Sequence, residues 1–385
     1  MGTNNQYNFK EAELGPNFAP QHMKDFKELI DSSISFVAMS MPGVGASYFL
    51  KYLSTQAFAL FFHVDLYSLP VLTQHEFYKL LLIELGGKPT SKTDEQLLLE
   101  SKKILKEFAQ KKDKIVIIFS HFDQLKKELD WNFLSNIQSF TTVAPGKIVL
   151  IFTSIKPLYE LAPDAVSGGN LNFYSENLYF KPFSKEDLKK LLSIEPARSV
   201  TKETLDHLLD LSGGHNQLLH ILLRSQKQQN FLLDQFVKLQ MKELIDYLNY
   251  QQKKEIQKMA SVASHPERAK RVEGSIDDYL LGVGMVKRVG KNFELFTPLL
   301  VEYLKLYFSP KLPPKEAKLL NLLRKNIGKV VTKDEIFEAL WEDSEKATDW
   351  ALDALIYRLR KHPFMKAHGY VIESQKKVGY ILIQT

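Results

Sequence analysis

A loop that contains two glycines lies between an apolar run and a helical pattern. The apolar run is Ser35–Ser40, and the loop continues as MPGVGAS through Ser47. A phosphate-binding loop joins a strand to a helix with the spacing G-x-x-x-x-G-K-[ST], so that its backbone N–H groups surround phosphate oxygens. In this register Gly45 and Ser47 are present, but Ala46 stands in place of the lysine and Ser40 in place of the first glycine.

The missing lysine limits what this loop can do. The lysine of a working loop neutralises charge on the β- and γ-phosphates, and the hydroxyl helps to hold Mg²⁺. Without the lysine, the loop still offers N–H donors at the start of a helix, where anions bind. We therefore expect Gly43, Gly45, Ala46 and Ser47 to contact any nucleotide, ATP or ADP with Mg²⁺, but we expect no efficient hydrolysis. One alternative is that Lys51, one turn further along the helix, supplies the missing charge.

The second part of such a site is an acidic residue at the end of a strand. The apolar run KIVIIF, residues 114–119, is followed by Ser120-His121-Phe122-Asp123. Ser120 takes the place of the expected carboxylate. Asp123 comes three residues late, either as a metal partner or as the first residue of a helix. The sequence identifies no partner for His121, so we assign it no catalytic role.

Two further residues have two interpretations each. Gly213 and Gly214 interrupt a helical segment, and His215 follows them directly. His215 either contacts a nucleotide or only begins the next helix. Asp65, after the second apolar run, is either structural or close to the site.

The elements that must position these residues alternate between strands and helices. Apolar runs predict strands at 35–40, 58–67, 114–119, 147–153 and 178–181, and periodicity predicts helices at 22–31, 74–85, 92–111 and 130–141. Apolar strands that alternate with helices indicate a parallel sheet covered on both faces. Right-handed crossovers then favour an α/β doubly wound sheet. The many Phe and Tyr residues fit its core.

These segments together resemble the STAND-type signalling ATPases, which are P-loop NTPases of the AAA-like kind. The resemblance is carried by the loop at 40–47, FFHVDLYSL (61–69), FTSIKPL (152–158), LSGGHNQLL (211–219) and MVKRVGKNFELFTPLLVEYL (285–304). The fourth segment matches a lid motif in which Asn216 replaces a proline, and the last is like the winged-helix segment that follows the lid. The resemblance spans residues 18–308 and implies a P-loop NTPase-like fold, and the replaced residues make this chain a degenerate member.

The last part of the chain has a different pattern. An amphipathic helix begins after Leu312 and stops at Gly328, and Thr332 three residues before Glu335 forms a capping box. A further helix runs over 348–361, and YVIESQKKVGYILIQ predicts a hairpin with a basic turn. Residues 358–385 hold six Lys or Arg against one Asp or Glu, whereas residues 312–357 hold seven against nine. One end of a small domain is therefore positive, which is typical of a nucleic-acid interface.

This part resembles the OmpR/PhoB-type winged helix, the effector domain of many bacterial response regulators. The resemblance is carried by Leu312, Pro314, Lys315, Glu316, Leu319, Leu320, the run 328–332, Ala339, Leu340, Trp341, Asp349, Asp353, Ile356, the run 358–361 and the run 378–380. It implies that helix 348–361 enters the major groove of double-stranded DNA. The residues that it implies at the DNA are Thr348, Trp350, Ala351, Ala354, Tyr357, Arg358, Arg360 and Lys361, together with Lys376 and Lys377 at the hairpin tip.

The chain departs from this family at three positions. Trp350 stands where the family often has Arg, Leu355 where it has a polar residue or His, and Lys377 where the wing often has Gly. These departures put base readout in doubt more than affinity. The other interpretation is that the basic cluster is a solvated face and the domain docks a protein. The basic run at 268–271 is likewise either a DNA contact or a solvated loop.

The composition excludes several classes of protein. The chain has 385 residues with 44% hydrophobic and 25% charged residues, a net charge of +6 and no cysteine. The lack of cysteine excludes disulfides, thiolate zinc sites and cysteine nucleophiles, and it fits a reducing cytosol. No apolar run reaches membrane-spanning length and the polar start shows no secretory signal, so we expect a cytoplasmic protein without a membrane partner.

The expected organisation has six segments. They are a polar tail (1–17), a degenerate P-loop NTPase-like α/β domain (18–184), a helical lid (185–248), a winged-helix-like unit (249–308), a linker (309–314) and the winged-helix DNA-binding domain (315–385). These parts predict a DNA-binding transcriptional regulator whose NTPase-like module senses a signal, self-associates or binds a regulatory protein. Two alternatives remain: a scaffold in which both modules bind proteins, and an active ATP-dependent switch.

Overall fold

The computed structural model describes residues 9–90, 93–167, 176–196, 200–228, 230–262, 276–290, 292–307, 312–341, 348–362, 364–365, 370–375 and 378–384. The chain divides into two compact units. The first comprises residues 1–223 and 276–287, and the second comprises residues 224–275 and 288–385. Segment 276–287, expected in the middle winged-helix-like unit, thus groups with the first unit.

A five-stranded parallel sheet forms the centre of the first unit. Its order is β2-β3-β4-β1-β5, with β1 at Phe36–Ser40, β2 at Leu60–Asp65, β3 at Ile115–Ser120, β4 at Ile148–Ser154 and β5 at Asn177–Phe180. Every residue of β3 and β4 is buried, because helices cover both faces of the sheet. The doubly wound sheet is therefore confirmed, and each strand overlaps its predicted range.

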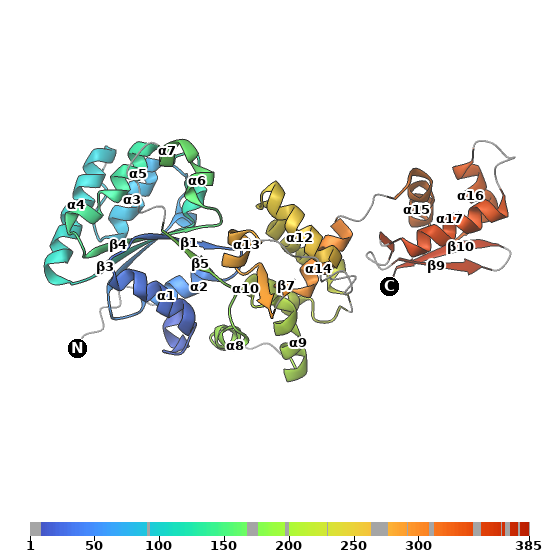
Figure 1. Cartoon of the computed structure of the whole chain (residues 1–385), viewed down its shortest axis with the longest axis horizontal. Coiled ribbons are helices and arrows are strands. Elements are labelled where there is room, and N and C mark those ends of the chain that lie inside the picture. Colours follow the sequence, from blue (N-terminus) through green and yellow to red (C-terminus); the bar gives the residue numbers. More distant parts are fainter. Residues whose placement is uncertain are drawn as a thin grey trace. The chain divides into compact units, whose positions relative to one another are not determined.

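Helices lie on both faces of this sheet. Figure 1 shows α1 (Pro20–Asp31) and α2 (Ala46–Ser54) on one face and α3 (Gln74–Glu84), α4 (Asp94–Lys111) and α5 (Trp131–Gln138) on the other. Two clusters of buried phenylalanine rings are Phe26, Phe36, Phe49 and Phe180, and Phe77, Phe119, Phe122, Phe133 and Phe152. The aromatic richness of this unit is thus mostly core.

Several short helices of this unit had no predicted range, although a helix start was one interpretation of Asp123. They are the 3-10 helices η1 (Lys10–Leu14), η2 (Leu66–Ser68), η3 (Phe122–Leu125) and η4 (Thr141–Val143), and the helices α6 (Leu158–Leu161) and α7 (Pro163–Ser167). Helix η1 lies inside the expected polar tail, yet it contacts α2, and Leu14 is buried. Helix α5 ends at Gln138, three residues before its predicted end at residue 141. The short helix η4 begins at Thr141.

A helical segment follows the sheet in the sequence and belongs mostly to the first unit. It contains α8 (Lys185–Ser193), α9 (Lys202–Ser212) and α10 (Asn216–Arg224). The short helix α13 (Asp278–Gly282) joins the same unit much later in the sequence. The Tyr279 hydroxyl donates to the carbonyl of Ile155 at 2.5 Å, and a Cβ on Gly282 would meet the Tyr179 ring.

The second unit begins with a group of helices. They are η6 (Phe231–Leu233), α11 (Gln235–Asp246), α12 (Tyr250–Val262) and α14 (Pro298–Tyr307), and α14 contacts both α11 and α12. Strands β6 (Val286–Val289) and β7 (Asn292–Leu295) form the hairpin predicted around Gly290. No helix in the described ranges has both the length and the apolarity needed to cross a membrane.

The C-terminal domain has the order of elements of a winged helix. It comprises α15 (Pro314–Lys325), β8 (Val330–Thr332), α16 (Lys333–Leu340), α17 (Asp349–Lys361), β9 (Tyr370–Gln375) and β10 (Gly379–Gln384), with an antiparallel sheet in the order β8-β10-β9. Its core includes Leu319, Leu323, Ile336, Leu352, Leu359 and Leu382. The predicted capping box of Thr332 and Glu335 is present.

One glycine of this domain is required by a close approach of two strands. A Cβ at Gly379 would lie 1.9 Å from the carbonyl oxygen of Val331, so β8 and β10 can pair there only if residue 379 lacks a side chain. Gly379 belongs to the Val-Gly-Tyr run that carried the resemblance. The close contact with Val331 is the physical reason for a glycine at this position.

Candidate functional site

The glycine loop has the backbone of a phosphate-binding loop. Gly43 and Gly45 adopt left-handed φ angles of 74° and 109°, and α2 begins directly after Gly45. In the described parts of the chain, no hydrogen-bond acceptor is found for the backbone N–H groups of Gly43, Gly45, Ala46 and Ser47. Unbonded backbone donors at a helix N-terminus form an anion-binding surface. The loop therefore keeps its backbone chemistry although the lysine is missing.

The start of α10 is bonded to the carbonyl side of this loop. The backbone N–H of Asn216 donates to Val44 at 3.2 Å, and that of Gln217 donates to Gly43 at 3.0 Å. The imidazole Nε2 of His215 donates to the Pro42 carbonyl at 2.8 Å. Three consecutive residues of the lid motif thus bind three consecutive residues of the loop.

His215 is a buried, neutral residue of this contact. Its Nδ1 accepts the backbone N–H of Leu218 at 3.2 Å, which leaves the proton on Nε2 for the Pro42 carbonyl. Burial lowers the pKa of His215 to about 4. The side chain therefore fastens α10 to the loop, as the helix-start interpretation proposed. A contact between His215 and a nucleotide stays a prediction.

Two side chains that the sequence did not single out lie against the loop glycines. A Cβ on Gly43 would fall 2.0 Å from Oε1 of Gln217, and a Cβ on Gly45 would fall 2.7 Å from the ring of Phe183. The sequence signal near this contact was the lid motif at 211–219, which contains Gln217. The glycines of the loop are therefore needed both for their φ angles and for space.

The end of β3 holds a serine and a histidine pair instead of a metal-binding carboxylate. Strand register places Asp65 opposite Ser120. The Ser120 hydroxyl is hydrogen-bonded to Nε2 of His63, and both residues are buried. Burial lowers the pKa of His63 to about 4. Ser120 is thus hydrogen-bonded to the neutral His63 of β2. Neither the serine hydroxyl nor the imidazole carries a negative charge.

His121 and Asp65 form a second pair at the same edge of the sheet. Nδ1 of His121 lies 2.9 Å from Oδ1 of Asp65, and the Tyr67 ring stacks on the imidazole at 3.7 Å. Burial acts to raise the pKa of Asp65, but the hydrogen bond and charge of His121, together with the backbone N–H of Tyr67 and the charge of His63, hold that pKa below its ordinary value. His121 has a left-handed φ of 58°. The structure thus supplies the partner for His121 that the sequence could not identify.

Asp123 and Lys51 occupy less favourable places for catalysis. Asp123 lies in the first turn of η3, which agrees with its interpretation as a helix-start residue. Burial raises its pKa, so the ionised form is disfavoured. The Lys51 ammonium lies over the Phe9 ring, 5.8 Å from its centre.

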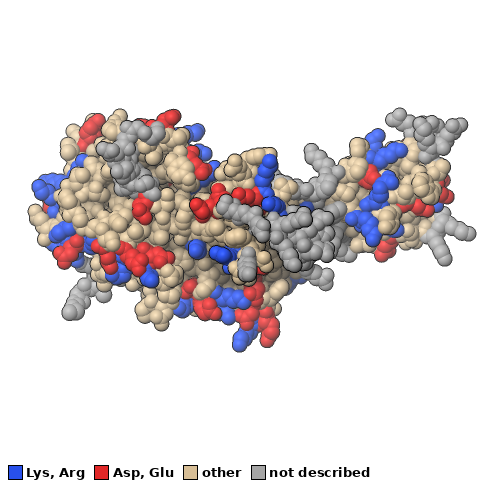
Figure 2. All heavy atoms as spheres, viewed as in Figure 1, with Lys and Arg blue, Asp and Glu red and all other residues tan. Residues whose placement is uncertain are grey.

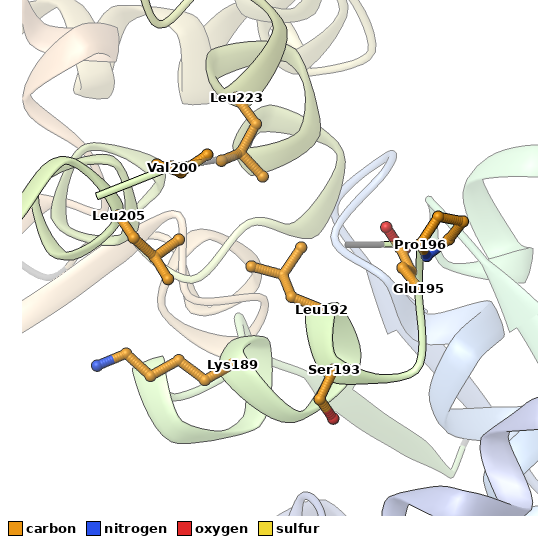
Figure 3. Close-up of a pocket in the computed structure, with 8 residues that line it drawn as sticks. All are labelled: Lys189, Leu192, Ser193, Glu195, Pro196, Val200, Leu205 and Leu223. Atoms are coloured by element: carbon orange, nitrogen blue, oxygen red, sulfur yellow. The ribbon is translucent and has the colours of Figure 1, made fainter. Parts of the chain in front are cut away.

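A separate cavity lies beside the helical segment and not at the loop. It is lined by Lys189, Leu192, Ser193, Glu195, Pro196, Val200, Leu205 and Leu223, as Figure 3 shows. Leu192, Leu205 and Leu223 come from α8, α9 and α10, and Pro196 and Val200 come from the segment between α8 and α9. None of the predicted site residues lines it, and we assign it no ligand.

The helix predicted to enter the DNA groove is α17. Thr348 caps it by accepting the backbone N–H of Ala351 at 3.2 Å. Its C-terminal cations also hold the domain together. Nε of Arg358 donates to Oε1 of Glu316 at 2.8 Å, and Arg360 donates to the Ile372 carbonyl at 3.0 Å.

Some of these cations remain available to a ligand. The Arg358 side chain is 58% exposed, although Glu316, its partner, is 7% exposed. Lys361 is exposed, and its ammonium lies 5.7 Å from the centre of the Tyr357 ring. Figure 2 shows Lys and Arg side chains gathered on the visible face of this domain. This end of α17 is therefore a positive surface.

The rest of the predicted DNA contacts fall into two groups. Trp350 and Tyr357 are exposed on α17, and Ala351 and Ala354 are partly exposed beside them. Lys376 and Lys377 lie outside the described residues, as does the basic run at 268–271.

The family comparison identifies the C-terminal domain. Residues 309–382 match the family described as "Transcriptional regulatory protein, C terminal". The winged helix of this kind that the sequence led us to expect is thereby confirmed. A comparison with curated proteins finds no match.

Several solved structures are distantly similar to this chain. A Walker-type ATPase of Pyrococcus abyssi is 13% identical with a TM-score of 0.45, covering 74% of this chain and 95% of that one. The ORC1 protein of Aeropyrum pernix, solved in complex with DNA, is 11% identical with a TM-score of 0.40, covering 98% and 94%. The RuvB Holliday junction branch migration motor of Thermotoga maritima is 12% identical with a TM-score of 0.34, covering 76% and 98%. Because these scores are low, we take the fold from the strand order itself.

Proposed function

We propose that this chain is a transcriptional regulator that binds double-stranded DNA through α17. The observation that carries the proposal is the family match over 309–382, together with the exposed cations at the end of that helix. Duplex phosphates attract such cations, and base edges are distinguishable in the major groove. We further propose that Lys376 and Lys377 at the hairpin tip contact the DNA backbone, and that the protein acts in the cytoplasm.

We also propose that the first unit is a degenerate, STAND-like module that does not hydrolyse ATP. Two features support this proposal: Ala46 replaces the lysine, and Ser120 is bonded to His63 where a carboxylate would hold Mg²⁺. The free N–H groups of the loop still suit a bound ADP or ATP, with Gly43, Gly45, Ala46, Ser47, Asp123 and His215 as the proposed neighbours. The module then acts by sensing a ligand, by self-association or by binding a regulatory protein.

We propose the segment boundaries expected from the sequence, with residues 276–287 of the middle unit packed in the first compact unit. The segments are the tail (1–17), the NTPase-like domain (18–184), the lid (185–248), the middle unit (249–308), the linker (309–314) and the DNA-binding domain (315–385). The contacts of His215, Asn216 and Gln217 support a role of the lid in holding the loop.

The test is fluorescence anisotropy of a labelled mixed-sequence duplex, titrated with the full chain at several salt concentrations. Affinity should fall with salt at a log–log slope of about −0.9 for each phosphate neutralised. Lys361→Ala should weaken binding and lower the slope by about one. Lys24→Ala, which removes an exposed lysine of α1, is the matched control. A weak response without salt dependence would favour the scaffold, in which the domain docks a protein.

The active-switch alternative has its own test. Phosphate release is measured with ATP and Mg²⁺ at high protein concentration. A rate equal to that of buffer supports the hydrolysis-deficient module, and steady turnover that is lost in Lys51→Ala would establish the switch instead.

A further inference from the structure

The first nine residues of α17, Asp349 to Tyr357, present apolar side chains to their surroundings. Trp350 is 81% exposed and Tyr357 is 63% exposed. With Ala354 and Lys361, they fall on one stripe of the helix, because residues three and four apart are neighbours on a helix surface. Between Asp349 and Tyr357 the sequence has no Arg, Lys, His, Asn or Gln. This part of the helix therefore lacks the side chains that read bases through paired hydrogen bonds.

The polar side chains of this part of α17 are hydrogen-bonded within the domain. The Tyr380 hydroxyl donates to Oδ1 of Asp353 at 2.6 Å, and the Lys333 ammonium lies 2.7 Å from Oδ1 of Asp349. The Thr348 hydroxyl caps the helix. Partners within the domain thus hold both carboxylates. The large side chains that remain exposed on this part of the helix are Trp350 and Tyr357.

The chemistry of the major groove offers one feature that suits such a surface. Guanine and adenine are read by bidentate Arg, Lys, Asn or Gln side chains, whereas the 5-methyl group of thymine is read by apolar contact. In helix-turn-helix proteins the N-terminal residues of the inserted helix contact base edges. The cations of α17 lie at its other end, where they would meet phosphates.

We propose that α17 recognises the 5-methyl groups of pyrimidines, thymine above all, through Trp350, Ala351, Ala354 and Tyr357. This inference rests on the proposed function. The occupant of the apolar face is duplex DNA because Arg358, Arg360 and Lys361 adjoin it and complement phosphate charge. Trp350, at the position where the resembling family often has Arg, changes the kind of base readout and does not abolish it.

The experiment compares two duplexes of identical mixed sequence and identical charge. In one, dU replaces every dT, so that no pyrimidine carries a methyl group. In the other, every pyrimidine carries one, as dT or as 5-methyl-dC. Anisotropy titrations use the full chain at one moderate salt concentration. We expect the methylated duplex to bind more tightly, by about fourfold for each methyl group that is fully buried.

Three variants locate the effect. Trp350→Ala should lose most of the preference for the methylated duplex and keep its salt dependence. Lys361→Ala should weaken binding to both duplexes by the same factor. Trp131→Ala, at a tryptophan that is 46% exposed in the first unit, should change neither.

The outcomes separate this inference from the proposed function. Salt-dependent binding that is equal for both duplexes overturns the methyl readout and leaves the DNA-binding proposal standing. Absence of salt-dependent binding to either duplex overturns the DNA-binding proposal itself. A methyl preference that survives in Trp350→Ala and Tyr357→Ala would assign the readout to another part of the chain and would also overturn the inference.

Discussion

Nε2 of His215 lies 2.8 Å from the carbonyl oxygen of Pro42 and donates its proton to it. This bond joins α10 to the loop between β1 and α2, although the two residues are far apart in the sequence. Because the imidazole is buried, it must be neutral in the folded protein, and its pKa of about 4 expresses that requirement.

The first prediction concerns acid. The pKa of His215 in the folded state is below its ordinary value of 6.5, so the unfolded chain binds the proton more readily between pH 6.5 and 4. The contribution of the neutral His215 side chain to the free energy of unfolding is therefore complete above pH 6.5, and it declines as the pH falls towards 4. His215→Gln should reduce the loss of unfolding free energy between pH 7 and pH 5 by about 2 kcal/mol. Urea denaturation at both pH values measures this difference.

The control for that measurement is His207→Gln, which removes an exposed histidine of α9. If the free energy of unfolding changed equally with pH in His215→Gln and in the unchanged protein, the folded state would tolerate the protonated imidazole.

The second prediction concerns the loop glycines. Gly43→Ala should destabilise the first unit by about 3 kcal/mol, because it combines a left-handed φ with a collision between Cβ and Gln217. Gly86→Ala, with a φ of 85° and open space around the added Cβ, should cost only about 1 kcal/mol. Adding Gln217→Ala should recover the difference. If Gln217→Ala gave no recovery, the lid would not lie on the loop in solution.

The third prediction concerns turnover. Ala46→Lys alone should not produce ATP hydrolysis, since Ser120 remains bonded to His63 and supplies no carboxylate. The matched variant is Ala46→Lys with Ser120→Asp, which supplies both missing groups. Measurable phosphate release by the single variant would refute our interpretation of Ser120.

The fourth prediction concerns the structural role of Arg358. Removing this side chain leaves the buried Glu316 carboxylate without its cation, so Arg358→Ala should lower the stability of the C-terminal domain by about 2 kcal/mol. The double variant with Glu316→Gln should be more stable than Arg358→Ala. Thermal unfolding measures both. If the stability changes of Arg358→Ala and Glu316→Gln simply added up in the double variant, the two side chains would not interact.

The sequence by itself determined the elements and their class. Five apolar runs became the five strands, because strands buried on both faces need near-continuous Val, Ile and Phe. The capping box at Thr332 and Glu335 is a local motif, so its residues could be recognised without knowing the fold. The C-terminal winged helix was likewise recognisable from the order of its residues.

Only the tertiary structure decided which distant side chains meet. Nothing local in the sequence pairs His63 with Ser120 or His121 with Asp65, because strand order and register bring these residues together. The same holds for Gln217 against Gly43 and for Arg358 against Glu316. Periodicity reports which face of an element is buried, whereas partners depend on how the elements pack, and the partners decide which charges remain free to bind.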